Sequence, residues 1–469
     1  MKKYDLIVLG SGPAGEKAAV KAAYFKKKVA IIEKEARYGG AGVNTGTLPS
    51  KTLKESALYY SGKYDKGLYG VERELKNKAS IKDFMWRKDF IIDSLNQEVR
   101  NNIILHDVDI YHGGGSFETD HVIKITSSKG EELIYGENIL IATGSYPYQP
   151  PDIPFDKKRV HDSDTILELP YFPSSICVVG AGVIGCEYAT IFGAMGAKVF
   201  LVNNNDRILG FLDNELSSEL VEQMKRDGIE ILFNTSFEKM TVPEDEKEPI
   251  VITLKTGETL EVDMFLYAAG RSANTKPLNC EKAGVQLGKR EVVSVDKDYR
   301  SSVPHIFAVG DVIGFPALAS TSMDQGRVAV SHIFGIDDLK EIVPVFPYGI
   351  YTIPEVSMVG LTEEQAKEKG IDYVTGKARY RDMPRGKIMG VQDGFLKLIF
   401  RRDTLEILGV HIIGPIASEI IHYGMMLVHN HTTIPQILAA VFNYPTLHDL
   451  YKYACYDGLG NRSGHKIKK

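Results

Sequence analysis

Residues 4–15 read YDLIVLGSGPAG, an apolar run that ends in a glycine-rich turn. The run from Tyr4 to Gly10 predicts a buried β-strand, and the alanine-rich segment from Pro13 to Phe25 predicts a helix. A second apolar run, Val29 to Ile32, completes a strand-helix-strand unit. This order of elements is typical of a nucleotide-binding fold with a parallel sheet.

The three glycines of this turn, Gly10, Gly12 and Gly15, have the spacing of a dinucleotide-binding loop. Such glycines permit a tight turn, let the backbone approach a pyrophosphate, and allow the helix to pack closely on the strand. Glu33 follows the second strand, where a carboxylate accepts hydrogen bonds from an adenosine ribose. We therefore predict a dinucleotide site here, in preference to a generic glycine turn beside a surface glutamate.

A second copy of the pattern lies near the middle of the chain. The apolar run Ile176–Val179 leads to another turn with the same spacing, formed by Gly180, Gly182 and Gly185. The residues after it predict a helix and then a second strand, Val199–Val202. A chain of 469 residues is long enough for about three domains, and two nucleotide-binding folds indicate an enzyme that uses two dinucleotides.

The second copy differs from the first at the end of its second strand, where Asn203 replaces an acidic residue. A carboxylate there would repel the 2′-phosphate of NADP by about 3 kcal/mol at ~5 Å. Asn203 removes this repulsion and predicts the use of both NAD and NADP. Arg207 is open to two interpretations, attraction of the 2′-phosphate or a solvated surface arginine.

The composition is that of an ordinary globular protein, with 43% hydrophobic and 25% charged residues. The net charge of -5 offers no basic surface for nucleic acid. No apolar run approaches the length of a membrane span or a signal-peptide core, so we expect a cytoplasmic protein. The spacing of the cysteines predicts neither a disulfide framework nor a metal centre; they are Cys177, Cys186, Cys280 and Cys455.

The rest of the chain completes a predicted α/β architecture. Segments 138–147 and 264–271 each read as a strand that ends in a tight turn, placed to close one nucleotide-binding lobe. From about residue 344 strands and helices mix without a glycine-rich turn, for example over 395–400 and 407–413. We predict two Rossmann-like dinucleotide-binding domains and a C-terminal α+β domain.

Four further motifs complete a family pattern: YGGAGVNTGTLPSK at 38–51, ATG at 142–144, AGR at 269–271 and IFAVGD at 306–311. With the two glycine turns in this order, the chain resembles the pyridine nucleotide-disulfide oxidoreductase family over essentially its whole length. The resemblance implies FAD at the first turn, NAD or NADP at the second, and a homodimer. It also implies an FAD-binding domain in two parts, an NAD(P)-binding domain and an interface domain, which span 1–150 with 273–343, 151–272, and 344–469.

The same resemblance assigns roles to individual residues. Asp311 binds the flavin ribityl chain, and the helix that begins at Leu318 and Ala319 points its N-terminus at the flavin, where it favours negative charge. Lys51 lies beside flavin N5 and pairs with Glu187, which makes these two the catalytic residues. The other residues that the resemblance assigns to the nucleotides are Lys34, Gly40, Gly115, Thr143, Gly144 and Gly270.

Two residues that the disulfide-reducing members need are missing. Those members carry two cysteines before Pro-Ser-Lys, and Gly42 and Thr47 stand at the matching positions. A thiolate is a soft nucleophile that neither a hydrogen atom nor a hydroxyl replaces, so disulfide reduction at this site is excluded. We interpret Cys186, after the second glycine turn, as a small hydrophobic residue, with a redox role as the less favoured alternative.

The catalytic histidine of the family is also replaced. Its HPTxxE motif corresponds to residues 444–449, which read YPTLHD. A phenol ordinarily titrates near pH 10 and an imidazole near 6.5, so Tyr444 is a poor proton shuttle at neutral pH. We interpret His448 as a surface histidine in preference to a substitute acid. The thiol relay is missing at both ends, which indicates one functional change.

Without the two cysteines and the histidine, the chain can still exchange hydride between nucleotides, and we predict this function. NADPH or NADH reduces FAD and leaves, and the oxidised form of the other nucleotide collects the hydride at the same place, without a general acid. Segments 182–188, 310–314 and 348–355 resemble the family members that perform this transhydrogenation. The alternatives are an NAD(P)H dehydrogenase that serves a quinone or a protein acceptor, with the flavin face freed by Gly42, and a non-catalytic scaffold that holds FAD.

Overall fold

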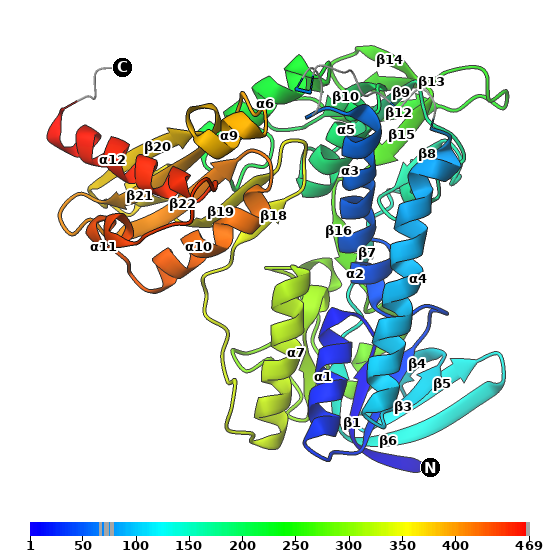
Figure 1. Cartoon of the computed structure of the whole chain (residues 1–469). Coiled ribbons are helices and arrows are strands. Elements are labelled where there is room, and N and C mark those ends of the chain that lie inside the picture. The colour runs from blue at the N-terminus through cyan, green and yellow to red at the C-terminus, as the bar shows by residue number, and fades with distance from the viewer. Residues whose placement is uncertain (65–67, 70–74, 76–78, 466–469) are drawn as a thin grey trace. The chain divides into compact units, whose positions relative to one another are not determined.

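The structure of the chain, a computed structural model, describes residues 1–64, 68–69, 75 and 79–465 (Figure 1). Its backbone divides into two compact units, and each unit is made of three chain segments. The first unit contains residues 1–52, 85–150 and 270–343. The second contains residues 53–84, 151–269 and 344–469.

The first unit is built on a mixed sheet with the strand order β3-β2-β1-β6-β5-β4, in which β17 also pairs with β6. Strands β1, β2, β3, β6 and β17 are parallel, and β4 and β5 are antiparallel additions. The strands are β1 Lys2–Leu9, β2 Val29–Glu33, β3 Asp109–His112, β4 Gly114–Phe117, β5 Val122–Ser127, β6 Gly130–Ile141 and β17 Ile306–Ala308, and a separate pair is β7 Ser145–Pro147 with β16 Arg271–Ala273.

Helices of the first unit cover its sheet, and α1 and α7 lie side by side (Figure 1). Residues of β1 alternate between two cores: Leu6 and Val8 pack with α1 and α7, while Ile7 and Leu9 face a core on the other side. A strand buried on both faces reads as the continuous apolar run seen in the sequence. The helices are α1 Pro13–Tyr24, α2 Gly40–Asn44, α4 Ile81–Leu105 and α7 Ala319–Phe334, and the 3-10 turns are Lys276–Leu278, Cys280–Ala283, Lys289–Glu291 and Gly310–Ile313.

The second unit holds a parallel sheet with the order β11-β10-β9-β15-β8, and a small antiparallel sheet, β12-β13-β14. The strands are β8 Val160–Asp162, β9 Ser175–Val179, β10 Lys198–Val202, β11 Glu230–Leu232, β12 Phe237–Thr241, β13 Ile250–Leu254, β14 Thr259–Val262 and β15 Met264–Tyr267. The helices are the 3-10 turn Thr165–Glu168, α5 Val183–Ala194, α6 Asn214–Arg226 and the part of α3 (Thr47–Ser61) that begins at Leu53; the first residues of α3 belong to the first unit. Both predicted strand-helix-strand units are therefore confirmed.

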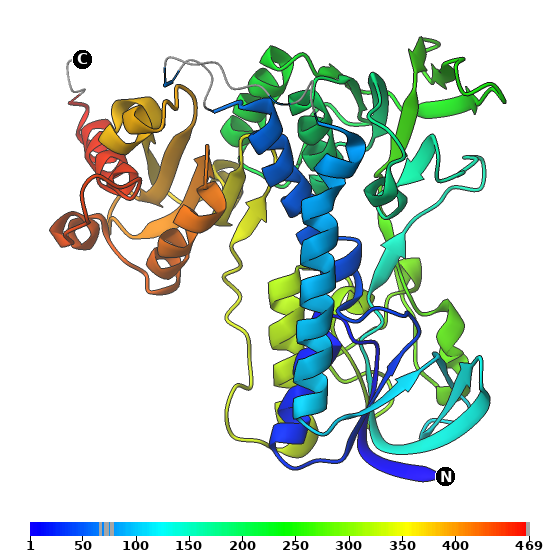
Figure 2. The same ribbon diagram turned by 45° about the vertical axis from the view of Figure 1, so that its right-hand side comes forward.

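The C-terminal part of the second unit is an antiparallel sheet, β18-β19-β22-β21-β20, with α10 against β19 and β22 and α12 against β20 and β21 (Figure 2). This confirms the predicted α+β character. The strands are β18 Tyr348–Ile350, β19 Val356–Gly360, β20 Tyr373–Arg379, β21 Phe395–Arg401 and β22 Ile407–Ile413. The helices are α8 Glu363–Glu368, the 3-10 turn Tyr380–Asp382, α9 Pro384–Ile388, α10 Ala417–His429, α11 Ile434–Ala439 and α12 Asp449–Ser463.

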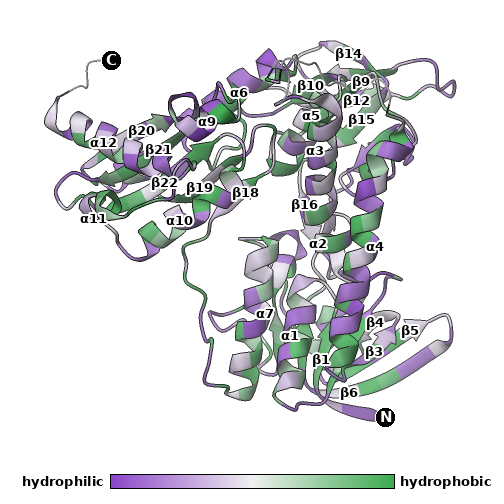
Figure 3. Cartoon of the chain, in the orientation of Figure 1, coloured by the Kyte–Doolittle hydropathy of each residue, from purple (hydrophilic) through white to green (hydrophobic). Residues whose placement is uncertain are grey.

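The distribution of hydrophobic and hydrophilic residues agrees with this arrangement of helices and sheets. In Figure 3 helices α1 and α4 carry both hydrophobic and hydrophilic bands, as helices with one buried side do. In the part of the chain that the structure describes, no helix combines the length and the apolar character that a membrane crossing needs.

Candidate dinucleotide-binding sites

The first glycine turn connects β1 to α1 in the first unit. Gly10 has a φ of 101°, and a Cβ atom on Gly15 would overlap the carbonyl oxygen of Gly10, so neither position accepts another residue without strain. Helix α1 begins at Pro13 with Gly12 as its N-cap and no side-chain cap. Its first N–H groups are therefore left for a ligand, and a helix N-terminus favours an anion such as a pyrophosphate.

Glu33 is buried at the carboxyl end of β2, beside this turn. Its Oε2 accepts hydrogen bonds from the backbone N–H of Ser11 at 2.9 Å and from the Ser11 hydroxyl at 2.6 Å. Its Oε1 accepts from the N–H of Glu35 at 2.9 Å. Ser11 was not among the predicted site residues, although a polar residue inside the glycine turn was the available signal. Lys34 is exposed and lies 3.5 Å from the Glu35 carboxylate.

Thr143 and Asp311 lie at the carboxyl ends of β6 and β17, which are adjacent parallel strands. The Thr143 hydroxyl oxygen is buried and has no hydrogen-bond partner among the described residues. Asp311 accepts a hydrogen bond from the Ser145 hydroxyl at 2.9 Å, and the same hydroxyl accepts from Nε of Arg271 at 2.9 Å. Ser145 and Arg271 thus orient Asp311; Ser145 directly follows the ATG motif, and Arg271 is the last residue of the AGR motif.

Helix α7 begins at Ala319, with Leu318 as an N-cap that offers no side-chain hydrogen bond. Its Gly326 packs directly on the backbone of Ala14 in α1. The first unit therefore holds two neighbouring helices with uncapped N-termini and an unsatisfied buried hydroxyl at Thr143. This donor set fits a dinucleotide with a polar ring system such as FAD.

Four other predicted glycines lie on the first unit. A Cβ atom on Gly40 would be 2.8 Å from the Cα of Gly12, so α2 begins in contact with the turn. A Cβ atom on Gly115 would touch the side chains of Leu9 and Ile32, which explains a glycine there by packing. Gly144 and Gly270 both have positive φ, at 69° and 128°.

The second glycine turn repeats the design of the first. A Cβ atom on Gly185 would overlap the carbonyl oxygen of Gly180, so α5 packs as closely on β9 as α1 packs on β1. Helix α5 has Gly182 as its N-cap, again without a side-chain cap, and no atom lies within 4 Å of a Cβ built on Gly182. This turn therefore has both the free N–H groups and the open space that a second pyrophosphate needs.

Asn203 is buried at the end of β10, where its side-chain N–H₂ donates to the carbonyl oxygens of Asn205 and Arg207 at 3.1 and 3.0 Å. The side chain therefore braces the loop that follows β10. The Arg207 guanidinium donates to the Leu212 carbonyl and to the Asn214 side chain. These contacts hold Arg207 to its own loop and to the start of α6, and both interpretations of its role stay open.

Glu187 is buried on α5, and its carboxylate accepts a hydrogen bond from the Tyr351 N–H at 2.9 Å. Lys51 lies on α3, and its Nζ is 3.3 Å from the Ser50 hydroxyl. Lys51 belongs to the first unit and Glu187 to the second, and their pairing stays a prediction. Cys186 is fully buried, and burial, with Glu187 as a smaller cause, raises the pKa of its thiol, which supports its interpretation as a small hydrophobic residue.

The structure also locates the residues that stand where the family has its two cysteines and its catalytic histidine. Gly42 lies in α2, Thr47 begins α3, and Tyr444 is exposed on this chain. His448 is half-buried, so it is less exposed than the surface histidine that the sequence interpretation expected. Its ring contacts the rings of Tyr423, Phe442 and Tyr451, and burial lowers its pKa against the smaller effect of Asp449. Tyr451 follows His448 by three residues at the start of α12, whereas Tyr423 belongs to α10.

Comparison with protein families agrees with this geometry. Residues 4–326 match the family described as pyridine nucleotide-disulphide oxidoreductase, and residues 346–455 match its dimerisation domain. The chain is 41% identical to a soluble pyridine nucleotide transhydrogenase from Mycobacterium bovis, over 97% of each chain. It is 38% identical to the protein of the same name from Hahella chejuensis, over 97% of this chain and 98% of that one.

Solved structures show the same fold. LpdA from Mycobacterium tuberculosis has a TM-score of 0.89 at 26% identity and covers 97% of this chain and 99% of its own. The HOCl-induced flavoprotein disulfide reductase RclA from Escherichia coli has a TM-score of 0.85 at 27% identity, over 96% and 99%. These matches confirm the predicted fold, an oxidoreductase activity and the use of FAD and NAD(P). The dimerisation domain supports the predicted homodimer.

Proposed function

The chain belongs to the pyridine nucleotide-disulphide oxidoreductase family, and from that premise we propose that it passes hydride between NADP(H) and NAD(H). Relatives that share 38 to 41% identity over nearly their whole length are named transhydrogenases, which supports the proposal. FAD, when bound, accepts a hydride from one nicotinamide nucleotide and returns it to another.

The absence of sulfur at positions 42 and 47 is the observation that carries the proposal. Gly42 and Thr47 replace the pair of thiols that a disulfide relay requires. The four cysteines of the chain all lie elsewhere, within the described residues, as buried free thiols. With no thiol to pass electrons on, the electron acceptor is a molecule that diffuses to the flavin, and a second nicotinamide nucleotide is such a molecule.

We propose that the first glycine turn holds FAD. Its helix N-terminus binds the pyrophosphate, Glu33 binds the ribose, and Asp311 and Thr143 hydrogen bond to the rest of the cofactor. Leu318 and Ala319 present the N-terminus of α7 to the flavin ring. The remaining proposed contacts of FAD are Gly10, Gly12, Gly15, Lys34, Gly40, Gly115, Gly144 and Gly270.

The second glycine turn, with Gly180, Gly182 and Gly185, is the proposed site for either nicotinamide nucleotide. Asn203 admits both because it carries no charge against a 2′-phosphate. Lys51 and Glu187 are the proposed catalytic residues, a cation and an anion whose pairing holds the lysine beside the flavin, where its charge favours the reduced ring.

The proposed domain division is FAD-binding over 1–150 and 273–343, NAD(P)-binding over 151–272, and interface over 344–469. The ends of the two compact units, at Pro150, Ala269 and Val343, support it. We also propose a cytoplasmic location, which the free state of all four cysteines supports.

Anaerobic mixing of the holoenzyme with NADPH, followed by thio-NAD, tests the function. Flavin absorbance should bleach with NADPH and recover with thio-NAD, as thio-NADH forms. Lipoamide and glutathione disulfide should give no recovery. Flavin that neither nucleotide bleaches would contradict the proposal and favour a non-catalytic scaffold.

The rival activity, a dehydrogenase that serves a quinone, has its own outcome in this experiment. Recovery with a quinone, and none with thio-NAD, would favour it. That rival expected Gly42 to open the flavin face, but a Cβ atom on Gly42 would lie 2.8 Å from Cγ of Pro13. The proline ring takes the space that the missing side chain leaves, which weakens the rival.

A further inference from the structure

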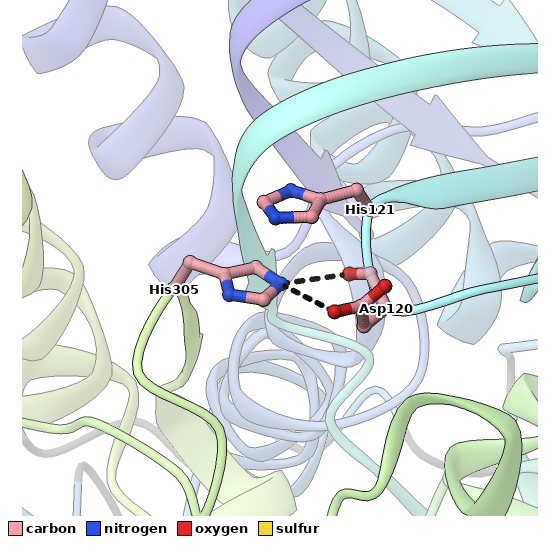
Figure 4. Close-up of side chains that lie close together, drawn as sticks. All are labelled: Asp120, His121 and His305. Atoms are coloured by element: carbon pink, nitrogen blue, oxygen red, sulfur yellow. Dashed lines mark hydrogen bonds and ion pairs between the residues drawn. The ribbon is translucent and has the colours of Figure 1, made fainter.

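Two histidines and an aspartate gather on the first unit, outside both glycine turns. Asp120 and His121 lie between β4 and β5, and His305 directly precedes β17. One ligand-capable atom of each residue lies within 4.8 Å of the other two. Figure 4 shows the three side chains close together, with His305 turned toward Asp120. Because Asp120 and His305 are 185 residues apart, the sequence offered no spacing that predicts this cluster.

The backbone of both histidines is held by β6. The N–H of Gly136 donates to the His121 carbonyl at 2.9 Å, and the N–H of Ile139 donates to the His305 carbonyl at 3.0 Å. Two positions on one rigid strand therefore set the distance between the two imidazoles. Ligands carried on a rigid element lose less conformational entropy when an ion binds than ligands on free loops.

The hydrogen bonds of His121 determine which nitrogen is available. Its Nδ1 lies 2.8 Å from the Gly136 carbonyl oxygen, and a carbonyl only accepts, so Nδ1 carries the hydrogen. The lone pair is then on Nε2. A backbone carbonyl that orients a histidine in this way is the usual outer partner of a metal-binding imidazole. Nε2 of His305 lies 3.1 Å from the Asp120 carbonyl oxygen and 3.8 Å from its carboxylate, so by the same argument Nε2 carries the hydrogen and the His305 lone pair is on Nδ1.

The two imidazole rings are parallel, with centroids 3.7 Å apart and an interplanar angle of 7°. A tetrahedral ion with bonds of ~2.0 Å separates its ligands by roughly 3.3 Å, with each lone pair in the plane of its ring. Binding therefore requires one ring to tilt out of the stack. The cluster permits this, because Asp120 is exposed and neither histidine is fully buried.

We propose that Asp120, His121 and His305 bind one divalent ion of the zinc class, with water in the remaining position. Two imidazole nitrogens and one carboxylate oxygen are a donor set that suits zinc and disfavours magnesium or calcium. The ion ties the segment between β4 and β5 to the segment before β17, so it stabilises the first unit. Gly136 lies five residues before the end of β6, roughly 17 Å from the first glycine turn, so the ion does not contact the proposed FAD pyrophosphate site.

Isothermal titration of the untagged holoenzyme with ZnCl₂, in a buffer that does not chelate, tests the proposal. We expect one Zn²⁺ per chain, and a rise in unfolding temperature with Zn²⁺ that EDTA reverses. His121→Ala and His305→Ala should each weaken Zn²⁺ binding by at least ~10-fold, because even an outer partner of a ligand has an effect of that size. The matched control is His431→Ala, which removes an exposed histidine that also contacts a carboxylate, Glu406.

The control variant should keep the wild-type affinity and the wild-type temperature shift. Unchanged Zn²⁺ affinity in the double variant His121→Ala/His305→Ala would overturn the proposal, and so would equal stabilisation by Mg²⁺. Because alanine could disturb the fold, flavin absorbance checks each variant, and the His305→Gln variant offers a milder second test. Hydride transfer should be the same in all of them, so this outcome is independent of the proposed function.

Discussion

The backbone of Gly42 lies against the ring of Pro13, and a Cβ atom added to the glycine would be 2.8 Å from Cγ of the proline. Real side chains do not approach so closely, so a larger residue at position 42 requires α2 or the start of α1 to shift. Pro13 is the first residue of α1, where its fixed φ begins the helix next to the proposed pyrophosphate site. A cysteine at position 42 would therefore require the first glycine turn to rearrange.

The first prediction is that Gly42→Ala destabilises the protein by ~1–3 kcal/mol, the usual cost of overpacking, although alanine is the better helix former. Thermal unfolding followed by flavin fluorescence measures the loss. The control is Gly114→Ala, where the nearest atom to the new Cβ is the Thr126 carbonyl oxygen at 4.0 Å. Equal effects of the two variants would show that the contact with Pro13 is not responsible.

The second prediction concerns the buried Thr143 hydroxyl, which has no partner among the described residues. If it hydrogen bonds to FAD, Thr143→Val should weaken FAD binding by ~1 kcal/mol, or roughly 5-fold. The apoprotein should unfold at the same or a higher temperature, because the variant removes an unsatisfied polar group. Unchanged FAD affinity, measured by titration of the apoprotein, would contradict the assignment.

The third prediction is that Asn203→Asp lowers kcat/KM for NADPH more than for NADH. The ratio of the two values should fall by up to ~100-fold, because the new carboxylate repels the 2′-phosphate of NADPH by about 3 kcal/mol. The substitution also removes the two hydrogen bonds to Asn205 and Arg207. Asn203→Ser removes the same bonds without adding charge and is the matched control. A similar NADPH-to-NADH ratio in both variants would assign the effect to the loop and not to charge.

The fourth prediction concerns Lys397, a buried lysine on β21 that holds three carboxylates. Its Nζ lies 2.8 Å from Asp213 and 3.3 Å from Glu215, and it also contacts Glu363. Lys397→Met removes the cation that Asp213 and Glu363 share, while Glu215 keeps Lys377, and it should destabilise the second unit by ~3–5 kcal/mol. Lys377→Met is the control, because Lys377 is partly exposed and pairs only with Glu215 among the residues described, so it should cost at most ~1 kcal/mol.

The effect of Lys397 should also depend on pH. Burial would raise the pKa of Asp213, but the charges of His411 and Lys397, with a hydrogen bond from Lys397, outweigh this effect. Burial would also raise the pKa of Glu215, but charges and hydrogen bonds from Lys377 and Lys397 outweigh it. Both pKa values therefore lie below their ordinary range. Carboxylates with lowered pKa values stabilise the fold above about pH 4, and this stability is lost as the pH falls. The stability difference between wild type and Lys397→Met, measured by urea unfolding, should thus shrink toward pH 4, and a difference that grows would contradict this account.

The amino-acid sequence alone determined the two glycine turns and the strands and helices beside them. Each depends on residues a few positions apart: an alternation or run of apolar residues, a glycine where a helix meets a strand, and an uncapped helix start such as Pro13 after Gly12. These constraints act between residues that are close in sequence, so they can be recognised from the amino-acid sequence alone. Resemblance to a family then identified the cofactors, and it showed that two cysteines are absent, at positions 42 and 47.

Only the tertiary structure decided which distant side chains meet. The support of Glu33 by Ser11, the contacts that orient Asp311 through Ser145, and the cluster around Lys397 all join segments that no periodicity relates. The half-burial of His448 depends in the same way on Tyr423, which belongs to a different helix, α10. The order of the strands in a sheet sets such neighbours, and that order is a property of the packed chain and not of any short stretch of it.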